Sequence, residues 1–254
     1  MDLQLAGKHA LITGGSKGIG RASAEILAEE GCDITIVART PATLEQASAA
    51  IRAKRQVNVC TIAADLSSDE AVRGLAAQAD SIDILVNNAG AIPPGDLLSV
   101  DNETWRRAWD LKVFGFISLC RAVYPQMAAR RSGVIVNVIG SAGEKFPPGY
   151  VCGAAGNAAL MAFTRALGRQ APSAGLRVVG INPGPVATDR MVMLQRDRAA
   201  KELGNPDRWQ ELLSGMPFAR AATPEEIANA VAFLASLRSG YTSGTILTID
   251  GGAG

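Results

Sequence analysis

Short apolar runs rich in β-branched residues alternate with longer stretches of helical periodicity along almost the whole chain. A strand–helix–strand alternation predicts parallel strands, because each helix carries the chain back to the same edge of the sheet by a right-handed crossover. The result is a doubly wound α/β fold with helices on both faces of a sheet of about seven strands. The expected strands are residues 9–13, 33–37, 57–63, 82–86, 134–138, 177–181 and 245–249.

Between these runs lie six stretches that we expect to be helices, and several of their starts carry capping residues. Thr223, Pro224 and Glu226 supply an N-cap hydroxyl, a proline at the first helical position and an acid at the third. No linker composition interrupts the pattern, so residues 1–254 are predicted to form a single domain. The expected helices are residues 18–30, 41–54, 68–79, 103–130, 150–170 and 224–237.

The alternation breaks once, over about residues 189–222. This region contains Met191, Leu194, Trp209 and Met216, a composition that favours a flap of short helices closing over an apolar ligand at a substrate site. An insertion that faces another subunit is the alternative interpretation.

Charge and composition exclude several classes of function. The chain has 25 basic and 24 acidic residues, a balance that argues against recruitment to nucleic acid or to an anionic membrane. Apolar runs are shorter than the roughly 18 residues of a membrane span, and the N-terminus does not read as a secretory signal. We therefore expect a cytoplasmic protein, with its four cysteines as free thiols. No metal-ligand spacing is found, so no metal is predicted.

A glycine-rich turn directly follows the first expected strand and opens the first expected helix. Its sequence is Thr13-Gly14-Gly15-Ser16-Lys17-Gly18-Ile19-Gly20. Free backbone amides at a helix N-terminus bind a pyrophosphate, and glycines remove side chains that would hold the phosphates away. The turn therefore predicts a dinucleotide site.

The spacing of this turn resembles the short-chain dehydrogenase/reductase family, and five further segments match that family in order. They are Asp65-Leu66, residues 87–90 (NNAG), residues 160–167 (LMAFTRAL), residues 182–188 (NPGPVAT) and Asp250-Gly251-Gly252. The resemblance implies one Rossmann-type domain, an oxidoreductase activity and a nicotinamide cofactor. It also implies a homo-oligomer, either a dimer or a tetramer. The cofactor-binding residues that it implies are Gly14, Ser16, Lys17, Gly18, Ile19, Gly20, Arg39, Asp65, Leu66, Asn88, Ala89, Gly90, Asn157, Pro183, Gly184, Val186 and Thr188.

The end of the second expected strand indicates which nicotinamide cofactor binds. An enzyme that uses NAD usually places an acid there to hold the adenosine ribose, and the acid would repel a 2′-phosphate. This chain has Arg39 instead, and Lys17 lies in the glycine-rich turn. Both cations are suited to a 2′-phosphate, so NADP(H) is the expected cofactor. The alternative is that both are ordinary surface charges.

The family's catalytic Asn, Ser, Tyr and Lys are all replaced. The register of the family pattern places Lys112 at the Asn position, Gly140 at the Ser position, Gly153 at the Tyr position and Asn157 at the Lys position. In the family the tyrosine exchanges the proton, and the lysine lowers its pKa and binds the nicotinamide ribose.

Four residues are candidates to compensate for this loss. Tyr150 and Asn157 give a Tyr-x6-Asn spacing that resembles the Tyr-x6-Lys of the enoyl-acyl carrier protein reductases. Lys112 and Asn157 look like an exchange of the family's Asn and Lys, so we expect Lys112 to lower the pKa of Tyr150. Ser141, one residue beyond the Ser position, is a candidate to orient a carbonyl. Alternatively, all four are remnants without a catalytic role.

Two functions are compatible with these residues. The first is an NADP(H)-dependent oxidoreductase that acts on a small apolar carbonyl, alcohol or enoyl substrate, where the nicotinamide supplies the hydride chemistry. The second is a catalytically weak or inactive NADP-binding protein that serves as a sensor or a partner subunit. Intact cofactor motifs fit both; Tyr150, Lys112 and the apolar flap favour the first.

Overall fold

The computed structural model describes residues 1–76 and 82–253. Within that part of the chain, seven parallel strands form one sheet in the order β3-β2-β1-β4-β5-β6-β7. The strand order reverses between β1 and β4, and ligands of doubly wound folds bind outside the carboxyl ends of the strands at such a point. The strands are β1 (His9–Thr13), β2 (Asp33–Ala38), β3 (Val59–Ala63), β4 (Ile84–Asn87), β5 (Val134–Val138), β6 (Arg177–Pro183) and β7 (Ile246–Ile249).

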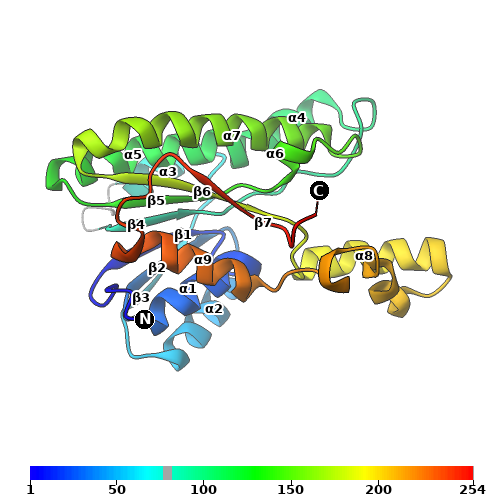
Figure 1. Cartoon of the computed structure of the whole chain (residues 1–254), viewed down its shortest axis with the longest axis horizontal. Coiled ribbons are helices and arrows are strands. Elements are labelled where there is room, and N and C mark those ends of the chain that lie inside the picture. The colour runs from blue at the N-terminus through cyan, green and yellow to red at the C-terminus, as the bar shows by residue number, and fades with distance from the viewer. Residues whose placement is uncertain (77–81, 254) are drawn as a thin grey trace.

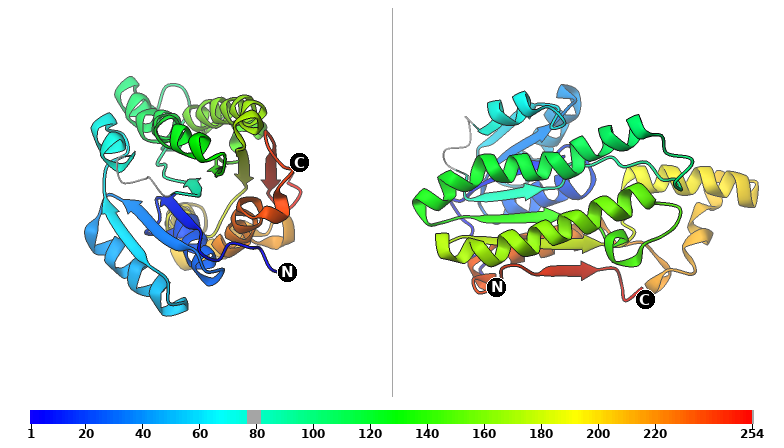
Figure 2. Two further views of the ribbon diagram at one scale, coloured as in Figure 1. Left: turned by 90° about the vertical axis from the view of Figure 1, so that its left-hand side faces the viewer. Right: turned by 90° about the horizontal axis from the view of Figure 1, so that it is seen from above.

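Helices cover both faces of the sheet (Figures 1 and 2). One face carries α1 (Gly18–Glu29), α2 (Pro41–Lys54) and α9 (Pro224–Ala235). The other carries α3 (Asp69–Ala76), α4 (Asn102–Trp109), α5 (Gly115–Arg130) and α7 (Val151–Gln170). Because both faces are covered, central strands bury side chains on both sides, and all five residues of β5 are buried. The expected doubly wound fold is confirmed; residues 77–79 of the expected third helix lie outside the described residues.

The expected helix over residues 103–130 is divided by a π-helical turn, η1 (Asp110–Phe114). The amide of Gly115 donates to the carbonyl of Asp110, five residues earlier, so the helix widens by one residue between α4 and α5. Such widened turns often occur at functional sites because they re-aim a side chain. Here the widened turn contains Lys112.

A buried hydrogen-bond network fixes α7 against the ends of the central strands. The Asn87 side-chain amide donates to Asn137 Oδ1 at 2.9 Å, and the Asn137 amide donates to Thr164 Oγ1 at 2.9 Å. Buried amides need such partners because an unpaired one costs about 1–3 kcal/mol. The network joins β4, β5 and α7, and it thereby holds the C-terminal half of α7 against the sheet.

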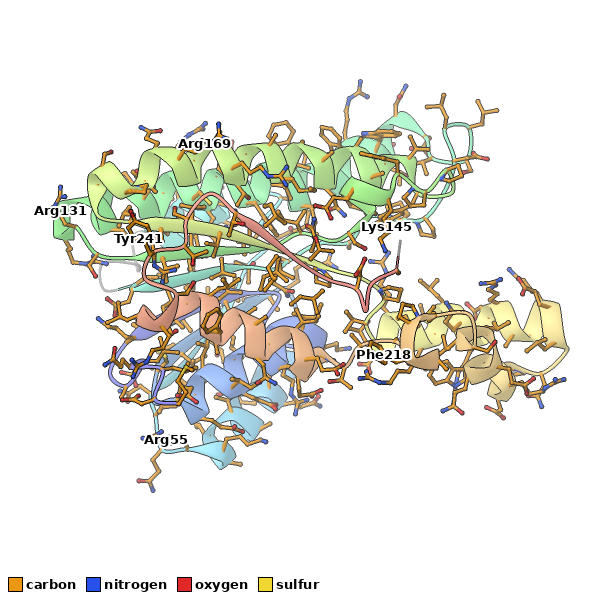
Figure 3. All side chains as sticks on the ribbon, in the orientation of Figure 1. Arg55, Arg131, Lys145, Arg169, Phe218 and Tyr241 are labelled. Carbon is orange, nitrogen blue, oxygen red and sulfur yellow. The ribbon has the colours of Figure 1, made fainter. Side chains whose placement is uncertain are left out.

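The flap region extends away from the body of the molecule (Figure 1). It contains one fifteen-residue helix, α8 (Asp189–Leu203), which packs on η3 (Pro206–Leu213) rather than on the sheet, so the expected set of short helices is only partly right. At its base the Ala187 amide donates to the Ala222 carbonyl at 2.8 Å, which joins the two ends of the segment. Phe218, in η4 (Pro217–Ala219), is 81% exposed near this base (Figure 3). The remaining short helices are α6 (Ala142–Lys145), η2 (Ala171–Ala174) and η5 (Leu237–Ser239).

Candidate active site

A cavity of about 570 Å³ lies at the carboxyl ends of the central strands, beside the switch point. Its wall is built from the glycine-rich turn, the NNAG segment, the end of β5, the loop after β6 and the start of α8. The expected cofactor residues in this wall are Gly14, Lys17, Gly18, Ile19, Asn88, Ala89, Gly90, Pro183, Gly184, Val186 and Thr188. The glycine-rich turn, the NNAG segment and the NPGPVAT segment, which are far apart in the sequence, therefore meet where the fold predicts a ligand.

The glycine-rich turn is packed so closely that side chains would not fit. Gly14 has φ +64°, and a Cβ there would lie 2.9 Å from Asn88 Nδ2. A Cβ on Gly20 would collide with the Gly14 carbonyl oxygen. The residue before α1 is Lys17, whose side chain has no acceptor to cap the first amides of the helix. Those amides and the positive end of the helix dipole therefore suit a bound phosphate.

The strand ends on either side of this turn are held by one hydroxyl. Thr13 Oγ1 accepts the backbone amides of Asn88 and Ala89 at 2.9 and 3.0 Å, which fixes NNAG beside the end of β1. From the other side, a Cβ on Gly18 would lie 3.0 Å from Thr188 Cγ2. The NPGPVAT loop thus faces the turn across a narrow groove.

An adjoining cavity of about 410 Å³ extends the groove toward β2 and β3. Ser16, Lys17, Arg39 and Leu66 line it, and Asp65 lines a neighbouring cavity together with Arg39. The Ser67 backbone amide, with a smaller contribution from Arg39, lowers the pKa of Asp65. The two cavities together suit a dinucleotide, and Lys17, Arg39 and Arg190 border the cavity at its expected adenosine end.

Tyr150 occupies the space that the family's tyrosine would need. A Cβ on Gly153 would collide with ring carbons of Tyr150, so the ring lies directly over this glycine. Tyr150 lines the 570 Å³ cavity, and burial raises the pKa of its phenol, while Arg190 lowers it and Cys152 adds to the rise. The Tyr150 ring therefore covers the Cβ position of residue 153 and borders the cavity.

Lys112 and Asn157 approach the same strand end from two elements. Lys112 Nζ donates to the carbonyls of Ile139 and Val138 at 2.9 and 3.3 Å, and the Asn157 amide donates to the next carbonyl, that of Gly140, at 3.2 Å. Lys112 lines the cavity, whereas Asn157 is 5% exposed and lies behind Gly140, outside the lining. Burial lowers the pKa of Lys112 to about 8, and the charge of Arg190 contributes.

The expected electrostatic effect of Lys112 on Tyr150 stays a prediction. The cation that lowers the pKa of Tyr150 is Arg190. The Lys112 ammonium, in turn, is held on two backbone carbonyls.

Ser141 is buried at the start of α6 and does not line the cavity. Its backbone amide donates to the Pro183 carbonyl at 2.9 Å, which joins the loop after β5 to the end of β6. The Asp250 carboxylate, in the C-terminal Asp-Gly-Gly segment, pairs with Lys145 at 2.6 Å, and a Cβ on Gly184 would lie 2.8 Å from Asp250 Cβ. These residues support the NPGPVAT loop from outside.

Arg190 is a site residue that the sequence patterns did not reveal. It lines the 570 Å³ cavity and both cavities at the adenosine end. Its Nη2 donates to the Ile92 carbonyl at 2.8 Å, across 98 residues of sequence. The only signal in the sequence was its place two residues after Thr188.

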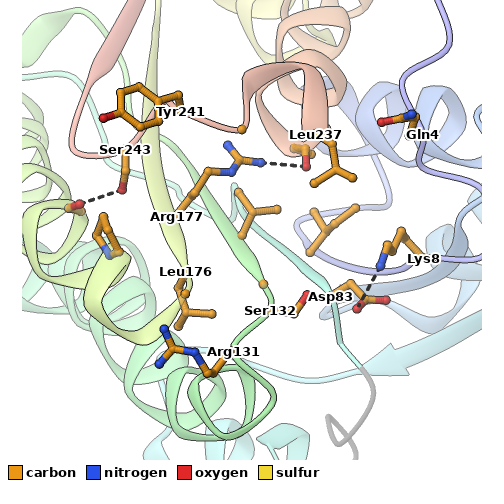
Figure 4. Close-up of a pocket in the computed structure, with 18 of the residues that line it drawn as sticks. Gln4, Lys8, Asp83, Arg131, Ser132, Leu176, Arg177, Leu237, Tyr241 and Ser243 are labelled. Carbon is orange, nitrogen blue, oxygen red and sulfur yellow. Dashed lines mark hydrogen bonds and ion pairs between the residues drawn. The ribbon is translucent and has the colours of Figure 1, made fainter.

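A larger cavity, of about 680 Å³, lies at the amino ends of the strands, away from the first cavity (Figure 4). Lys8, Asp83, Gly133 and Leu176, which directly precede strands, border it, and Arg177 donates to the Leu234 carbonyl at 2.8 Å beside it. Because ligands of doubly wound folds bind at the carboxyl ends of the strands, size alone does not make this cavity the active site.

A phosphate-binding turn at the switch point of a doubly wound sheet defines a dinucleotide-binding protein of the Rossmann type. A family model described as enoyl-(acyl carrier protein) reductase matches residues 14–254. The chain belongs to the short-chain dehydrogenase/reductase family.

Relatives cover nearly the whole chain. The 3-oxoacyl-[acyl-carrier-protein] reductase FabG of Chlamydia muridarum is 34% identical, over 99% of this chain and 99% of that protein. Galactitol 2-dehydrogenase (L-tagatose-forming) of Cereibacter sphaeroides is also 34% identical, over 98% and 96%. The structure of L-sorbose reductase from Gluconobacter frateurii, complexed with NADPH and L-sorbose, has a TM-score of 0.94 at 33% identity, with 99% and 98% covered.

Proposed function

We propose that this protein is an NADP(H)-dependent oxidoreductase that transfers a hydride to or from an apolar carbonyl, alcohol or enoyl substrate. The observation that carries the proposal is the position of the Tyr150 ring over Gly153, on the wall of the cavity that the cofactor segments enclose. When bound, the nicotinamide supplies or accepts the hydride. Tyr150 then gives the proton to the substrate oxygen or carbon in reduction and takes one back in oxidation.

The cofactor is NADP(H), as the charges around the adenosine end indicate. Arg39 lies at the end of β2 where an acid would exclude a 2′-phosphate, and Lys17 borders the same cavity. A guanidinium binds a phosphate through two parallel hydrogen bonds, which a ribose hydroxyl cannot match. Two of the similar proteins have solved structures described with NADPH or NADP bound.

Lys112 has the place from which to bind the nicotinamide ribose, because its ammonium lies at the end of β5 beside Gly90. Asn157 and Ser141 act from behind the wall in this proposal. Asn157 holds the Gly140 carbonyl, and Ser141 holds the end of β6 through its backbone. The four compensating residues thus divide into two that border the cavity and two that support it.

Apolar side chains from the flap face the reacting end of the cavity. Met191 and Leu194 of α8 line it together with Val138 and Ile139. A substrate with an apolar chain beside its carbonyl or double bond would bury these side chains, and each Å² of apolar surface removed from water stabilises the complex by about 25 cal/mol.

We propose that the enzyme works in the cytoplasm as a homo-oligomer. Among the described helices, none is long and apolar enough to cross a membrane.

The test is Tyr150→Phe, assayed with NADPH on a 3-oxobutanoyl thioester, a 2-butenoyl thioester and a ketose. The panel separates C=O from C=C reduction and acyl from sugar substrates. The variant should lower kcat at least about tenfold on whichever substrate the wild type reduces, because general acid catalysis is typically worth 10²–10⁴-fold. NADPH affinity, followed by nicotinamide fluorescence, should not change.

The matched control is Tyr241→Phe. It also removes a phenol hydroxyl, but from a fully exposed residue beside the cavity at the amino ends of the strands. Its kcat should equal that of the wild type. An unchanged rate in Tyr150→Phe would show that another group exchanges the proton. A wild type that binds NADPH but reduces none of the panel would contradict the proposed substrate range.

A further inference from the structure

One loop holds both Tyr150 and Arg190. Gly95 pairs with the Tyr150 segment as a parallel bridge, its amide donating to the Gly149 carbonyl at 2.8 Å and its carbonyl accepting the Val151 amide at 3.2 Å. Three residues earlier in the loop, the Ile92 carbonyl accepts Arg190 Nη2 at 2.8 Å. The intervening Pro93 and Pro94 restrict the backbone between the two anchor points.

The Ile92 side chain strengthens this link. It is 3% exposed and belongs to a small apolar cluster with Cys152, against which Tyr150 packs. The residue whose carbonyl fixes the Arg190 guanidinium therefore contacts the same cluster as the Tyr150 ring. Tyr150 and Arg190 also line the same 570 Å³ cavity.

We infer that Arg190 is a positioning residue that holds a positive charge beside Tyr150 and so favours its phenolate, in place of the lysine that the family pattern would put at position 157. The charge comes from the start of the flap helix α8 rather than from α7. The inference rests on the proposed function, because it concerns the proton that Tyr150 exchanges.

The other charged and titratable groups near Tyr150 do not take this part. Lys112, from η1, has its ammonium on the Val138 and Ile139 carbonyls. Cys152, on α7, raises the pKa of Tyr150 rather than lowering it. Lys17 and Asp189 complete the charged lining of the cavity.

The chemical need for such a cation follows from burial. Removing the Tyr150 phenol from water raises its pKa, which leaves little phenolate to accept a proton in oxidation near neutral pH. A nearby guanidinium lowers that pKa and stays charged throughout the working range. Arg190 is exposed, so solvent screens part of its field, and its effect should be strongest when substrate and flap exclude water.

The experiment follows the titration of Tyr150 directly, without turnover. Protein labelled with carbon-13 at the tyrosine phenol carbon gives three signals, from Tyr124, Tyr150 and Tyr241, and Tyr150→Phe assigns the relevant one. Arg190→Gln should move the Tyr150 titration to higher pH, whereas Arg190→Lys should stay close to the wild type. Arg196→Gln, which removes the same charge farther along α8, should leave it unchanged.

The pH profile of alcohol oxidation supplies the second measurement. In Arg190→Gln its rising limb should move to higher pH with the titration, and the rate below the midpoint should fall several-fold. An unchanged Tyr150 titration in Arg190→Gln would overturn the inference, as would a shift produced by Lys112→Met instead. If the titration moves but Tyr150→Phe keeps full activity, the charge coupling stands and the proposed proton donor fails.

Discussion

At the residue scale, the contact between Tyr150 and Gly153 carries the proposed chemistry. The family register predicts a tyrosine at the position of Gly153, and Tyr150 places its ring over that glycine. Residues three apart on a helix share a face, with Cβ atoms about 5–6 Å apart. Because Tyr150 lies just before the first turn of α7, its backbone has φ −146° and ψ 42°, so the ring turns back over the helix start.

This packing predicts that Gly153→Ala removes activity without removing the fold. A single methyl group at position 153 would collide with the Tyr150 ring and push it out of the cavity wall. The variant should lower kcat about as much as Tyr150→Phe, while circular dichroism and NADPH binding stay as in the wild type. The matched control is Gly149→Ala, whose Cβ would meet nothing within 4 Å.

The reciprocal exchange tests the same space. Gly153→Tyr alone should be inactive or poorly folded, because two rings compete for one site. Combined with Tyr150→Ala, it should recover activity above that of Gly153→Tyr, since residues in contact do not act additively. If Gly153→Ala keeps full kcat, the Tyr150 ring does not work from the position in which the structure places it.

The sequence predicted the cofactor segments and Tyr150, but not Arg190. A glycine-rich turn is local, so its residues could be identified from spacing alone. Arg190 acquires its place from a hydrogen bond to a residue 98 positions away, and no periodicity encodes that contact. The direction of the Lys112 side chain likewise depends on the π-helical turn η1, which the sequence pattern did not predict.

At the element scale, strands were easier to predict than irregular helices. β1 and β5 have the predicted bounds, because a buried parallel strand is a continuous apolar run between polar residues. The widened turn η1 has no such signature, so α4, η1 and α5 were expected to be one helix. In the flap, the Thr188 hydroxyl caps α8 by accepting the Met191 amide at 3.4 Å. A threonine before an acidic residue is a helix-start signal that the sequence does contain at this point.

The start of α9 anchors the far end of the flap, and this contact should depend on pH. Glu226 accepts two hydrogen bonds of 2.7 Å from Arg220 and one of 2.8 Å from the Thr223 amide. Arg220 first, then Thr223, lowers the pKa of Glu226 from 4.5 to about 2. A depressed pKa means that the stabilisation is complete above about pH 4.5 and is lost as the pH falls toward 2.

Glu226→Gln should therefore lower the free energy of unfolding at neutral pH, and its difference from the wild type should shrink as the pH falls below 4.5. Urea unfolding from pH 7 to pH 3 measures this. Glu225→Gln, in the same first turn of α9, is the control and should give a difference with much weaker pH dependence. A Glu226→Gln difference that stays constant over this range would contradict the assignment.

At the scale of the whole molecule, cofactor binding and stability are linked. A ligand that binds only the folded chain stabilises it by about 2.7 kcal/mol at a hundredfold excess over Kd. Residues at the ends of β2, β5 and β6, in the turns after β1 and β4 and in α8 line the groove. A bound cofactor should therefore stabilise elements from both halves of the sheet together. Thermal unfolding of the full chain therefore reports cofactor affinity without any knowledge of the substrate.

Arg39 makes this measurement selective between cofactors. It borders the adenosine end of the groove, and only NADPH carries a 2′-phosphate there for it to bind. The wild type should gain more thermal stability from NADPH than from an equal concentration of NADH. Arg39→Ala should lose most of that advantage while its response to NADH stays the same; a tenfold loss of NADPH affinity corresponds to about 1.4 kcal/mol.

The control is Arg73→Ala, which removes an exposed arginine of α3 outside the groove and should respond to both cofactors as the wild type does. Equal losses for the two cofactors in Arg39→Ala would mean that Arg39 supports the groove as a whole, and the preference for NADP(H) would then have to come from Lys17.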